Sequence, residues 1–178
     1  MIRPAQHKDA SAIADIYNHY IETTFITFEE ETVSANTIKE RMGDLESGYP
    51  WFVHENEDGE ITGYAYGSSW HRRSAYRYIA ETSIYLRPDQ SGKGIGTTLY
   101  RRLLEGLKEF GVHVAIGGAA LPNPASVALH EKLGFEKAAH YKAIGWKMGR
   151  WIDVVYWQIQ LNEGKPEAGL GRLHSQSS

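Results

Sequence analysis

The sequence predicts a mixed α/β fold. Three observations predict it: segments of helical periodicity alternate with segments of strand character, one strand runs directly into a glycine-rich loop and a helix, and no internal repeat or interdomain linker is visible. A chain of 178 residues can bury a sizeable core. We therefore expect one domain over residues 1–161, followed by a mobile tail over 162–178, where apolar residues are few.

Two helices are predicted before residue 50. The first covers 9–22, because its apolar residues recur at the spacing of one helix face. The second is short: it begins after Ser34, a good N-cap residue, and ends at Gly48 and Pro50.

Strands dominate the middle of the chain. Segments 51–55 and 61–66 flank the turn residues Asp58 and Gly59, so they predict a β-hairpin. Segment 78–86 is rich in aromatic and β-branched residues, which favours a third strand.

The third strand leads into a glycine-rich loop, and the helix that follows covers 97–110. Beyond that helix the pattern predicts one more short helix and three more strands. The helix is 126–133, and the strands are 112–116, 135–141 and 151–161.

Composition excludes several classes of protein. A formal net charge of -3 argues against a strongly basic nucleic-acid binder, and we expect no nucleic-acid partner. The absence of cysteine excludes disulfide scaffolds, thiolate zinc sites and cysteine nucleophiles. No stretch approaches the roughly 18 apolar residues of a membrane span, and no apolar signal segment opens the chain. We therefore expect a soluble, cytoplasmic protein without a membrane partner.

Three glycines alternate immediately before the third predicted helix, at Gly92, Gly94 and Gly96. Backbone N–H groups of such a loop can converge on an anion at a helix N-terminus, which suits a pyrophosphate. A P-loop is excluded because Lys93 is followed by glycine rather than Ser or Thr, and the dinucleotide fingerprint lacks its third glycine. A tight loop without a ligand is the alternative.

The loop resembles the coenzyme A loop of the GCN5-related N-acetyltransferase (GNAT) family, where Gly94 and Gly96 match. Ser91 departs from the Gln or Arg of the family pattern, and Gln90 lies one residue too early. Segment 123–135, an Asn before a helix that ends in Leu-Gly-Phe, resembles the second family signature. The resemblance implies the GNAT acyl-CoA N-acyltransferase fold, a mixed central sheet flanked by helices.

Within the family the chain resembles the phosphinothricin N-acetyltransferase group, from Ile2 to about Leu161. The local matches are segments 16–18, 80–85, 129–131 and 149–153. The resemblance implies transfer of acetyl from acetyl-CoA to the amino group of phosphinothricin, methionine sulfoximine or a related amino acid. It also implies a homodimer and a role in detoxification or resistance.

Acetyl transfer to an ammonium group needs a base, and Glu81 is the first candidate. It lies in an otherwise apolar and aromatic strand, where desolvation raises the pKa of a carboxyl group. A carboxylate on an edge strand, facing water, is the alternative. The resemblance favours catalysis.

His130 in the predicted late helix is the second candidate, because the charge of histidine changes near neutral pH. A histidine hydrogen-bonded for structure is the alternative. The metalloprotease pattern is absent, since no second histidine follows at the fourth position, and we expect no metal. The resemblance supports His130 as a partner of Glu81.

Three arginines in segment 70–77 precede Glu81, and the planar guanidinium suits a carboxylate or phosphinate group. The resemblance favours Arg73 and Tyr76 as binders of the acceptor, with Phe28 and Tyr66 as walls of its pocket. A solvated basic loop is the alternative.

The resemblance also implies which residues hold acetyl-CoA. The backbone of the predicted central strand would pair with the pantetheine arm, the loop would hold the pyrophosphate, and the Asn before the late helix would contact the arm. The predicted residues are Ile84, Tyr85, Leu86, Lys93, Gly94, Ile95, Gly96, Thr97, Thr98 and Asn123. Tyr100 or another nearby tyrosine would protonate the thiolate.

We therefore expect an enzyme that transfers acetyl directly within a ternary complex. No acyl-enzyme is expected, because the chain has no cysteine and no serine in a nucleophile elbow. Two alternatives stay open: a non-catalytic acyl-CoA-binding sensor, and an acetyltransferase of another amine or of a protein.

Overall fold

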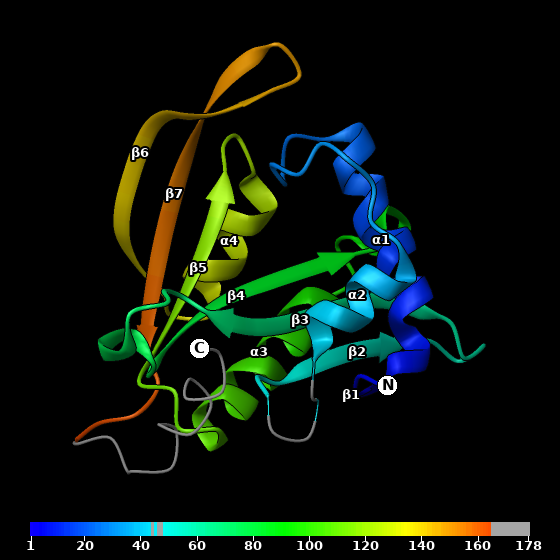
Figure 1. Cartoon of the computed structure of the whole chain (residues 1–178), viewed down its shortest axis with the longest axis horizontal. Coiled ribbons are helices and arrows are strands. Elements are labelled where there is room, and N and C mark those ends of the chain that lie inside the picture. Colours follow the sequence, from blue (N-terminus) through cyan, green and yellow to red (C-terminus); the bar gives the residue numbers. More distant parts are fainter. Residues whose placement is uncertain (44, 46–47, 165–178) are drawn as a thin grey trace.

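The computed structural model describes residues 1–43, 45 and 48–164 (Figure 1). Within these residues a seven-stranded sheet has the order β1-β2-β3-β4-β5-β7-β6. Its strands are β1 (Ile2–Pro4), β2 (Trp51–Glu55), β3 (Ile61–Ser69), β4 (Ile79–Leu86), β5 (Val114–Ala120), β6 (Glu136–Lys147) and β7 (Arg150–Gln160). The β4–β5 pair is parallel, and the other neighbouring strands are antiparallel. The predicted mixed sheet is confirmed.

Helices cover both faces of the sheet. Their bounds are α1 (Ala10–Thr23), α2 (Ala35–Met42), α3 (Ile95–Glu109) and α4 (Pro124–Lys132), and short 3-10 turns are η1 (His7–Asp9), η2 (Ser74–Tyr76) and η3 (Pro88–Gln90). The helices α1 and α2 form one core cluster with Trp51, Val53 and Tyr64. Side chains of α3 form the second cluster with Ala65 and Ala80 on the opposite face. The two clusters lie on opposite faces of the sheet because successive side chains of each strand point to opposite faces.

Local sequence signals explain most helix ends. The Ser34 hydroxyl accepts a hydrogen bond from the Thr37 amide, 3.0 Å, as the N-cap of α2. The predicted end at Gly48 is wrong: α2 ends at Met42, because Gly43 adopts a φ of +54° that ends the helix five residues earlier.

The structure also differs from the prediction at several strands. The three-residue strand β1 was not predicted, because its short segment has no alternating pattern of its own. The predicted strand 135–141 continues as β6 to Lys147, through register shifts that include one between Tyr141 and Gly145. As a result the β6–β7 hairpin is long, and Figure 1 shows it extending beyond the ends of β4 and β5.

The predicted tail begins with a fixed residue. Nδ2 of Asn162 donates hydrogen bonds to the carbonyl oxygens of Lys108, 3.0 Å, and Val112, 2.8 Å. Residues 165–178 of the predicted tail lie outside the described residues.

The strands β4 and β5 separate halfway along their length. Their parallel pairing runs from Ile79–Val114 to Thr82–Gly117 and then stops, although β4 continues to Leu86 and β5 to Ala120. Each strand stays paired on its other side, with β3 and β7 respectively. The separation therefore opens the middle of the sheet.

Candidate active site

A cleft of ≈ 660 Å³ lies where β4 and β5 separate. We call it the β4–β5 cleft. Its walls come from α1, from β4 residues 82–86, from the glycine loop, from the end of β5 and from α4. The residues predicted to hold acetyl-CoA that line it are Ile84, Tyr85, Leu86, Gly94, Gly96, Thr97 and Asn123.

The β5-facing edge of β4 is available to a ligand. Among the described strands, none pairs with this edge after Thr82. Its N–H and C=O groups therefore need another partner, and an extended amide-containing chain can supply one as an added strand does. The Tyr20 hydroxyl donates to the Leu86 carbonyl oxygen, 2.6 Å, and so closes one end of this edge.

The glycine loop has the backbone of an anion cradle. Gly92 and Gly94 have φ of +79° and +80°, and a Cβ at either would meet open space. Gly94 is the N-cap of α3, and its carbonyl oxygen accepts from the Thr98 amide, 3.2 Å. The amides of the first turn precede that bond and have no partner within the helix, so they favour an anion. The loop fits the pyrophosphate of coenzyme A.

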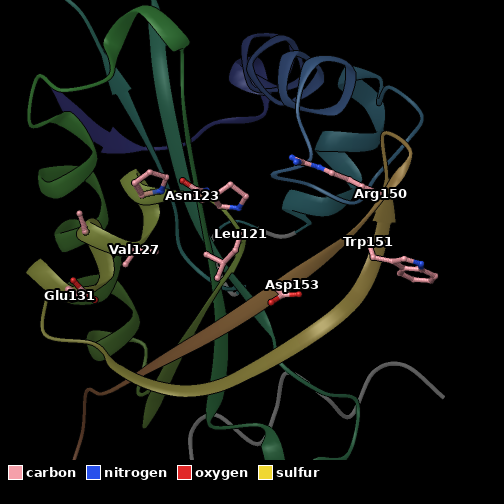
Figure 2. Close-up of a pocket in the computed structure, with 10 residues that line it drawn as sticks. Leu121, Asn123, Val127, Glu131, Arg150, Trp151 and Asp153 are labelled. Atoms are coloured by element: carbon pink, nitrogen blue, oxygen red, sulfur yellow. The ribbon is translucent and has the colours of Figure 1, made fainter.

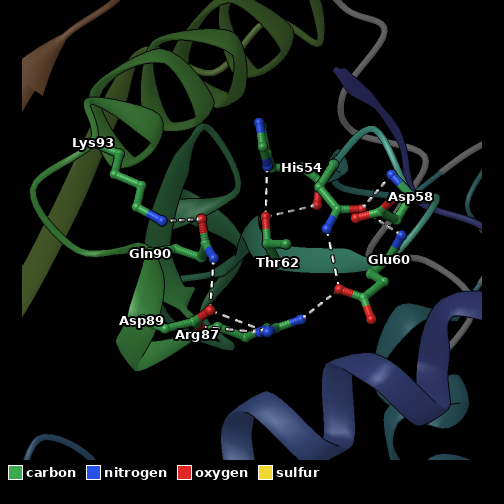
Figure 3. Close-up of polar contacts among 9 residues, drawn as sticks. His54, Asp58, Glu60, Thr62, Arg87, Asp89, Gln90 and Lys93 are labelled. Atoms are coloured by element: carbon green, nitrogen blue, oxygen red, sulfur yellow. Dashed lines mark hydrogen bonds and ion pairs between the residues drawn. The ribbon is translucent and has the colours of Figure 1, made fainter.

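Three predicted loop residues do not line the cleft: Lys93, Ile95 and Thr98. The Lys93 ammonium donates to Gln90 Oε1, 3.2 Å, and Gln90 Nε2 donates to Asp89, 2.7 Å (Figure 3). Asp89 in turn pairs with Arg87. Lys93 and Gln90 thus belong to a surface polar network, whereas Ser91 lines the cleft.

Asn123 is fixed by the local helix start. Its Oδ1 accepts a hydrogen bond from the Ser126 amide, 3.1 Å, as the N-cap of α4, and Pro124 occupies the first turn. This capping bond holds the Asn123 side chain at the cleft wall.

Thr82, Tyr100 and His130 form a buried polar chain at the bottom of the cleft. The Thr82 hydroxyl lies 2.6 Å from the Tyr100 hydroxyl, which lies 3.2 Å from His130 Nε2. His130 is 3% exposed, and burial lowers its pKa. A Cβ at Gly117 would overlap His130, so a glycine is needed where β5 passes this ring.

Glu81 lies on the other face of the sheet. Thr82 faces Tyr100 and α3, and successive strand residues alternate, so Glu81 points to the face that carries Ser83 and Tyr85. We call this the acceptor face. Among the described residues, no hydrogen bond joins Glu81 to His130. The two side chains therefore project from opposite faces of the sheet and are not hydrogen-bonded to each other.

Burial raises the pKa of Glu81, and the nearby His71 offsets part of the rise. Tyr66 and Tyr156 are close enough for the Glu81 charge to raise their pKa values further, after the larger effect of burial. The predicted rise in the pKa of this carboxyl group is confirmed, although the side chain is half-buried rather than fully buried. Its neighbours His71 and Tyr156 were missed, because nothing in their local sequence indicates that they reach Glu81.

The four predicted acceptor residues occupy different places. Tyr66 is on the acceptor face and opposite Ser83. Tyr76 lies in η2, with its ring 5.2 Å from that of His71, and Arg73 is exposed just before η2. Phe28 lies on the connection between α1 and α2, against Gly145. Tyr66 and Tyr76 are therefore linked to the Glu81 surroundings, whereas Arg73 and Phe28 lie at the periphery.

Residues of α1 and of the segment after it complete the cleft wall: His19, Tyr20 and Ile26. They were not predicted from the sequence. Their only local signal is the helical pattern of 9–22, which does not say what the exposed face of the helix contacts.

A second cavity, ≈ 680 Å³ and open to solvent, lies between α4 and β7 (Figure 2). Of its two acidic residues, Glu131 and Asp153, Asp153 already accepts from His140 Nε2, 2.8 Å, and from the Ala143 amide, 2.9 Å. The ring of Trp151 points away from it in Figure 2. This cavity lacks both the glycine cradle and the buried titratable groups, so the β4–β5 cleft is the better candidate for chemistry.

The described residues contain neither a cluster that could hold a metal ion nor a helix that could span a membrane. In the part of the chain that the structure describes, no group of three or more His, Cys, Asp or Glu side chains is arranged to hold a metal ion. No helix over the same residues is long and apolar enough to cross a membrane.

Comparisons with known proteins agree with this architecture. The family model of the acetyltransferase (GNAT) domain matches residues 2–156. The L-amino acid N-acyltransferase MnaT of Escherichia coli is 39% identical over 171 residues, which are 96% of this chain and 99% of that protein. The L-methionine sulfoximine/L-methionine sulfone acetyltransferase of Salmonella typhimurium is 38% identical, over 91% of this chain and 95% of its own.

A solved structure is similar over almost the whole chain. The phosphinothricin acetyltransferase of Sinorhizobium meliloti, in complex with acetyl-CoA, superposes with a TM-score of 0.90 at 38% identity, covering 95% of this chain and 94% of its own. Sequence and fold thus agree on one assignment: the chain belongs to the GNAT family of acetyltransferases.

Proposed function

We propose that the protein transfers the acetyl group of acetyl-CoA to the amino group of a small amino acid of the phosphinothricin and methionine sulfoximine type. The observation that carries the proposal is the separation of β4 from β5 after Thr82. The resulting opening connects the side of the sheet that carries the glycine cradle with the side that carries the Glu81 carboxyl group. Relatives that are named for these acceptors, at 38% identity, support the substrate class, as does an L-amino acid N-acyltransferase at 39% identity.

Acetyl-CoA would be held by main-chain groups. The pyrophosphate would lie on the amides around Gly94 and Gly96, and the pantetheine arm along the free edge of residues 84–86. This arrangement directs the thioester into the opening between the strands, next to Tyr100 and His130.

Glu81 would act as the base. Its carboxylate takes a proton from the acceptor ammonium, directly or through one water, and the amine nitrogen then attacks the thioester carbonyl carbon. The nitrogen loses its second proton to water as the tetrahedral intermediate collapses, and the C–S bond breaks to leave the amide and the thiolate. The thiolate takes a proton from the Tyr100 hydroxyl, which recovers one from solvent, while Glu81 releases its own.

The acceptor would bind on the acceptor face. Tyr66 and Tyr76 would contact it near Glu81, and Arg73 would approach its acidic group from the exposed turn η2. Phe28 would form the outer wall.

A homodimer is part of the proposal. Five large apolar side chains of the β6–β7 hairpin are more than half exposed: Tyr141, Ile144, Trp146, Met148 and Trp151. A second copy that covers this surface would remove it from water. Sedimentation of the purified chain tests this, and a monomer at micromolar concentration would contradict it.

We further propose that the enzyme works in the cytoplasm and protects cells from toxic amino-acid analogues. Expression in a sensitive bacterial strain should raise the concentration of methionine sulfoximine that stops growth. Expression of the Glu81→Gln protein should not.

The test of the activity itself is thiol release from acetyl-CoA over an acceptor panel. The panel contains phosphinothricin, methionine sulfoximine, methionine, glutamate, a polyamine and a lysine peptide. Turnover confined to the small amino acids supports the proposal. No thiol release with any of the six acceptors, while acetyl-CoA still raises the melting temperature, would favour an acyl-CoA-binding sensor. Turnover of the peptide alone would favour a protein acetyltransferase.

A further inference from the structure

Lys147, the last residue of β6, is a buried charged side chain that the proposed reaction does not use. It is 4% exposed, and its ammonium donates to three main-chain carbonyl oxygens: those of Ile21, 2.8 Å, Thr27, 2.9 Å, and Glu29, 2.8 Å. An ammonium group has three hydrogens and no acceptor, so these bonds satisfy it completely. A neutral amine would leave one carbonyl facing a lone pair.

The three carbonyls come from segments far from Lys147 in the sequence. Ile21 lies in the last turn of α1, where carbonyls lack partners within the helix and a positive charge is favourable. Thr27 and Glu29 lie on the connection that leads from α1 to α2. The Lys147 side chain therefore fixes both the end of α1 and the segment after it by hydrogen bonds.

The same hairpin holds this segment at two further points. The Phe28 ring lies against Gly145, where a Cβ would overlap the ring. The Arg150 guanidinium lies over the Phe25 ring, 4.1 Å from its centre. Residues of β6 and β7 thus contact segment 24–29 along most of its length.

Segment 24–29 reaches the candidate active site from its other side. Ile26 lines the β4–β5 cleft. The Thr27 hydroxyl lies 2.8 Å from the Tyr17 hydroxyl, and the Tyr17 ring packs edge-on against Tyr85 of the acceptor face, 5.0 Å between ring centres. Displacement of this segment would therefore alter the wall between the cleft and the acceptor face.

We propose that Lys147 is a positioning residue for the amino-acid acceptor: it fixes segment 24–29 so that Ile26 and Phe28 form the wall against which the acceptor binds. Glycine at position 145 provides the space for Phe28. The identity of the acceptor rests on the proposed function. The fixing of segment 24–29 by Lys147, which we call the clamp, rests on the contacts of Lys147.

The first test is kinetic, on the full chain with the best acceptor of the panel. Lys147→Met removes the charge and the three donors but keeps the length of the side chain. We expect it to raise KM for the amino acid at least tenfold, with KM for acetyl-CoA within twofold. Lys147→Arg, which keeps the charge and donors, should recover part of the loss, and Lys137→Met, at an exposed position of the same strand, should change neither constant.

The second test needs no acceptor. Amide hydrogen exchange in segment 24–29 should be at least tenfold faster in Lys147→Met than in the wild type, with the loop at 92–98 unchanged. If the wild type acetylates nothing in the panel, the proposed function fails, and exchange alone decides the clamp. If Lys147→Met does not fold, Gly145→Ala replaces it, because the new Cβ displaces Phe28 and should raise the acceptor KM selectively.

Unchanged exchange in segment 24–29 would overturn the inference. So would an equal loss for acceptor and acetyl-CoA, because a general loosening of the fold predicts that pattern and a local positioning role does not.

Discussion

The Tyr100 hydroxyl lies 3.2 Å from Nε2 of His130, while Nδ1 of the same ring lies 2.7 Å from the Ser126 carbonyl oxygen. A carbonyl oxygen only accepts, so Nδ1 carries a hydrogen. Burial lowers the pKa of His130 and favours the neutral ring, whose Nε2 then accepts from Tyr100. The nitrogen that could take a proton from an acceptor is already engaged, and this leaves Glu81 as the better base.

Glu81→Gln should lower kcat/KM about 10²–10⁴-fold, the usual contribution of a general base. Acetyl-CoA should protect the variant against heat as it protects the wild type. An exposed glutamate of α3, Glu105→Gln, is the control. Turnover of Glu81→Gln at the wild-type rate would contradict the assignment.

The pH profile tests the same carboxyl group in the wild type. Burial raises the pKa of Glu81 above its ordinary value of 4.5, so the active carboxylate is present above that raised pKa and is lost as pH falls through it. The acidic limb of kcat/KM should therefore lie above pH 4.5. An acidic limb that persists unchanged in the residual activity of Glu81→Gln would assign it to another group.

Tyr100→Phe tests the buried polar chain. The change removes the hydroxyl that serves Thr82 and His130, and unsatisfied buried groups cost about 1–3 kcal/mol of unfolding free energy. We also expect kcat to fall, because in the proposed reaction this hydroxyl would return the proton to the thiolate. Denaturant unfolding and steady-state kinetics measure the two effects, with Tyr78→Phe, which keeps the ring beneath Arg77, as the control. A loss of stability with kcat unchanged would limit Tyr100 to a structural role.

Gly94 and Gly59 offer a matched pair of glycines. Both have φ of +80° and open space where a Cβ would lie, but only Gly94 lines the β4–β5 cleft. Alanine at either position should cost about 1–2 kcal/mol of stability, since left-handed backbone disfavours a side chain. Only Gly94→Ala should also raise the Kd for acetyl-CoA, measured by calorimetry. Equal affinity of both variants for acetyl-CoA would contradict the binding of its pyrophosphate by the glycine loop.

Asp9 contributes stability that depends on pH. Desolvation alone would raise its pKa, but hydrogen bonds from Arg3, 2.8 and 2.9 Å, and from the Gln6 amide lower the pKa below 3.8. The carboxylate is thus more favourable in the folded chain, and its contribution is present above pH 3.8 and lost as pH falls through the lower folded pKa. Asp9→Asn should cost about 2 kcal/mol at pH 7 and progressively less toward pH 3. A cost that does not change with pH would contradict this account.

The sequence could predict whatever depends on local pattern. The run from strand 78–86 through Gly94 into the next helix was confirmed, because alternation, a glycine with positive φ and a helical face are all local signals. The raised pKa of Glu81 was predicted from its apolar strand for the same reason. The GNAT resemblance supplied the mixed sheet, which periodicity alone does not.

Contacts between distant segments could not be predicted. Tyr20 reaches the Leu86 carbonyl across 66 residues, and Lys147 reaches α1 across more than a hundred. Neither residue differs locally from an ordinary surface tyrosine or lysine. The separate faces of Glu81 and His130 were missed because the resemblance named both residues without the register of β4.

The most direct test of the account counts both products of one reaction. Wild-type protein is mixed with acetyl-CoA and methionine sulfoximine, free thiol is titrated, and the N-acetylated amino acid is measured by mass spectrometry. We predict one N-acetyl product for each thiol, and neither product above background with Glu81→Gln. Thiol without an acetylated amino acid, or stable acetyl-CoA binding with neither product for any acceptor of the panel, would contradict an amino-acid acetyltransferase.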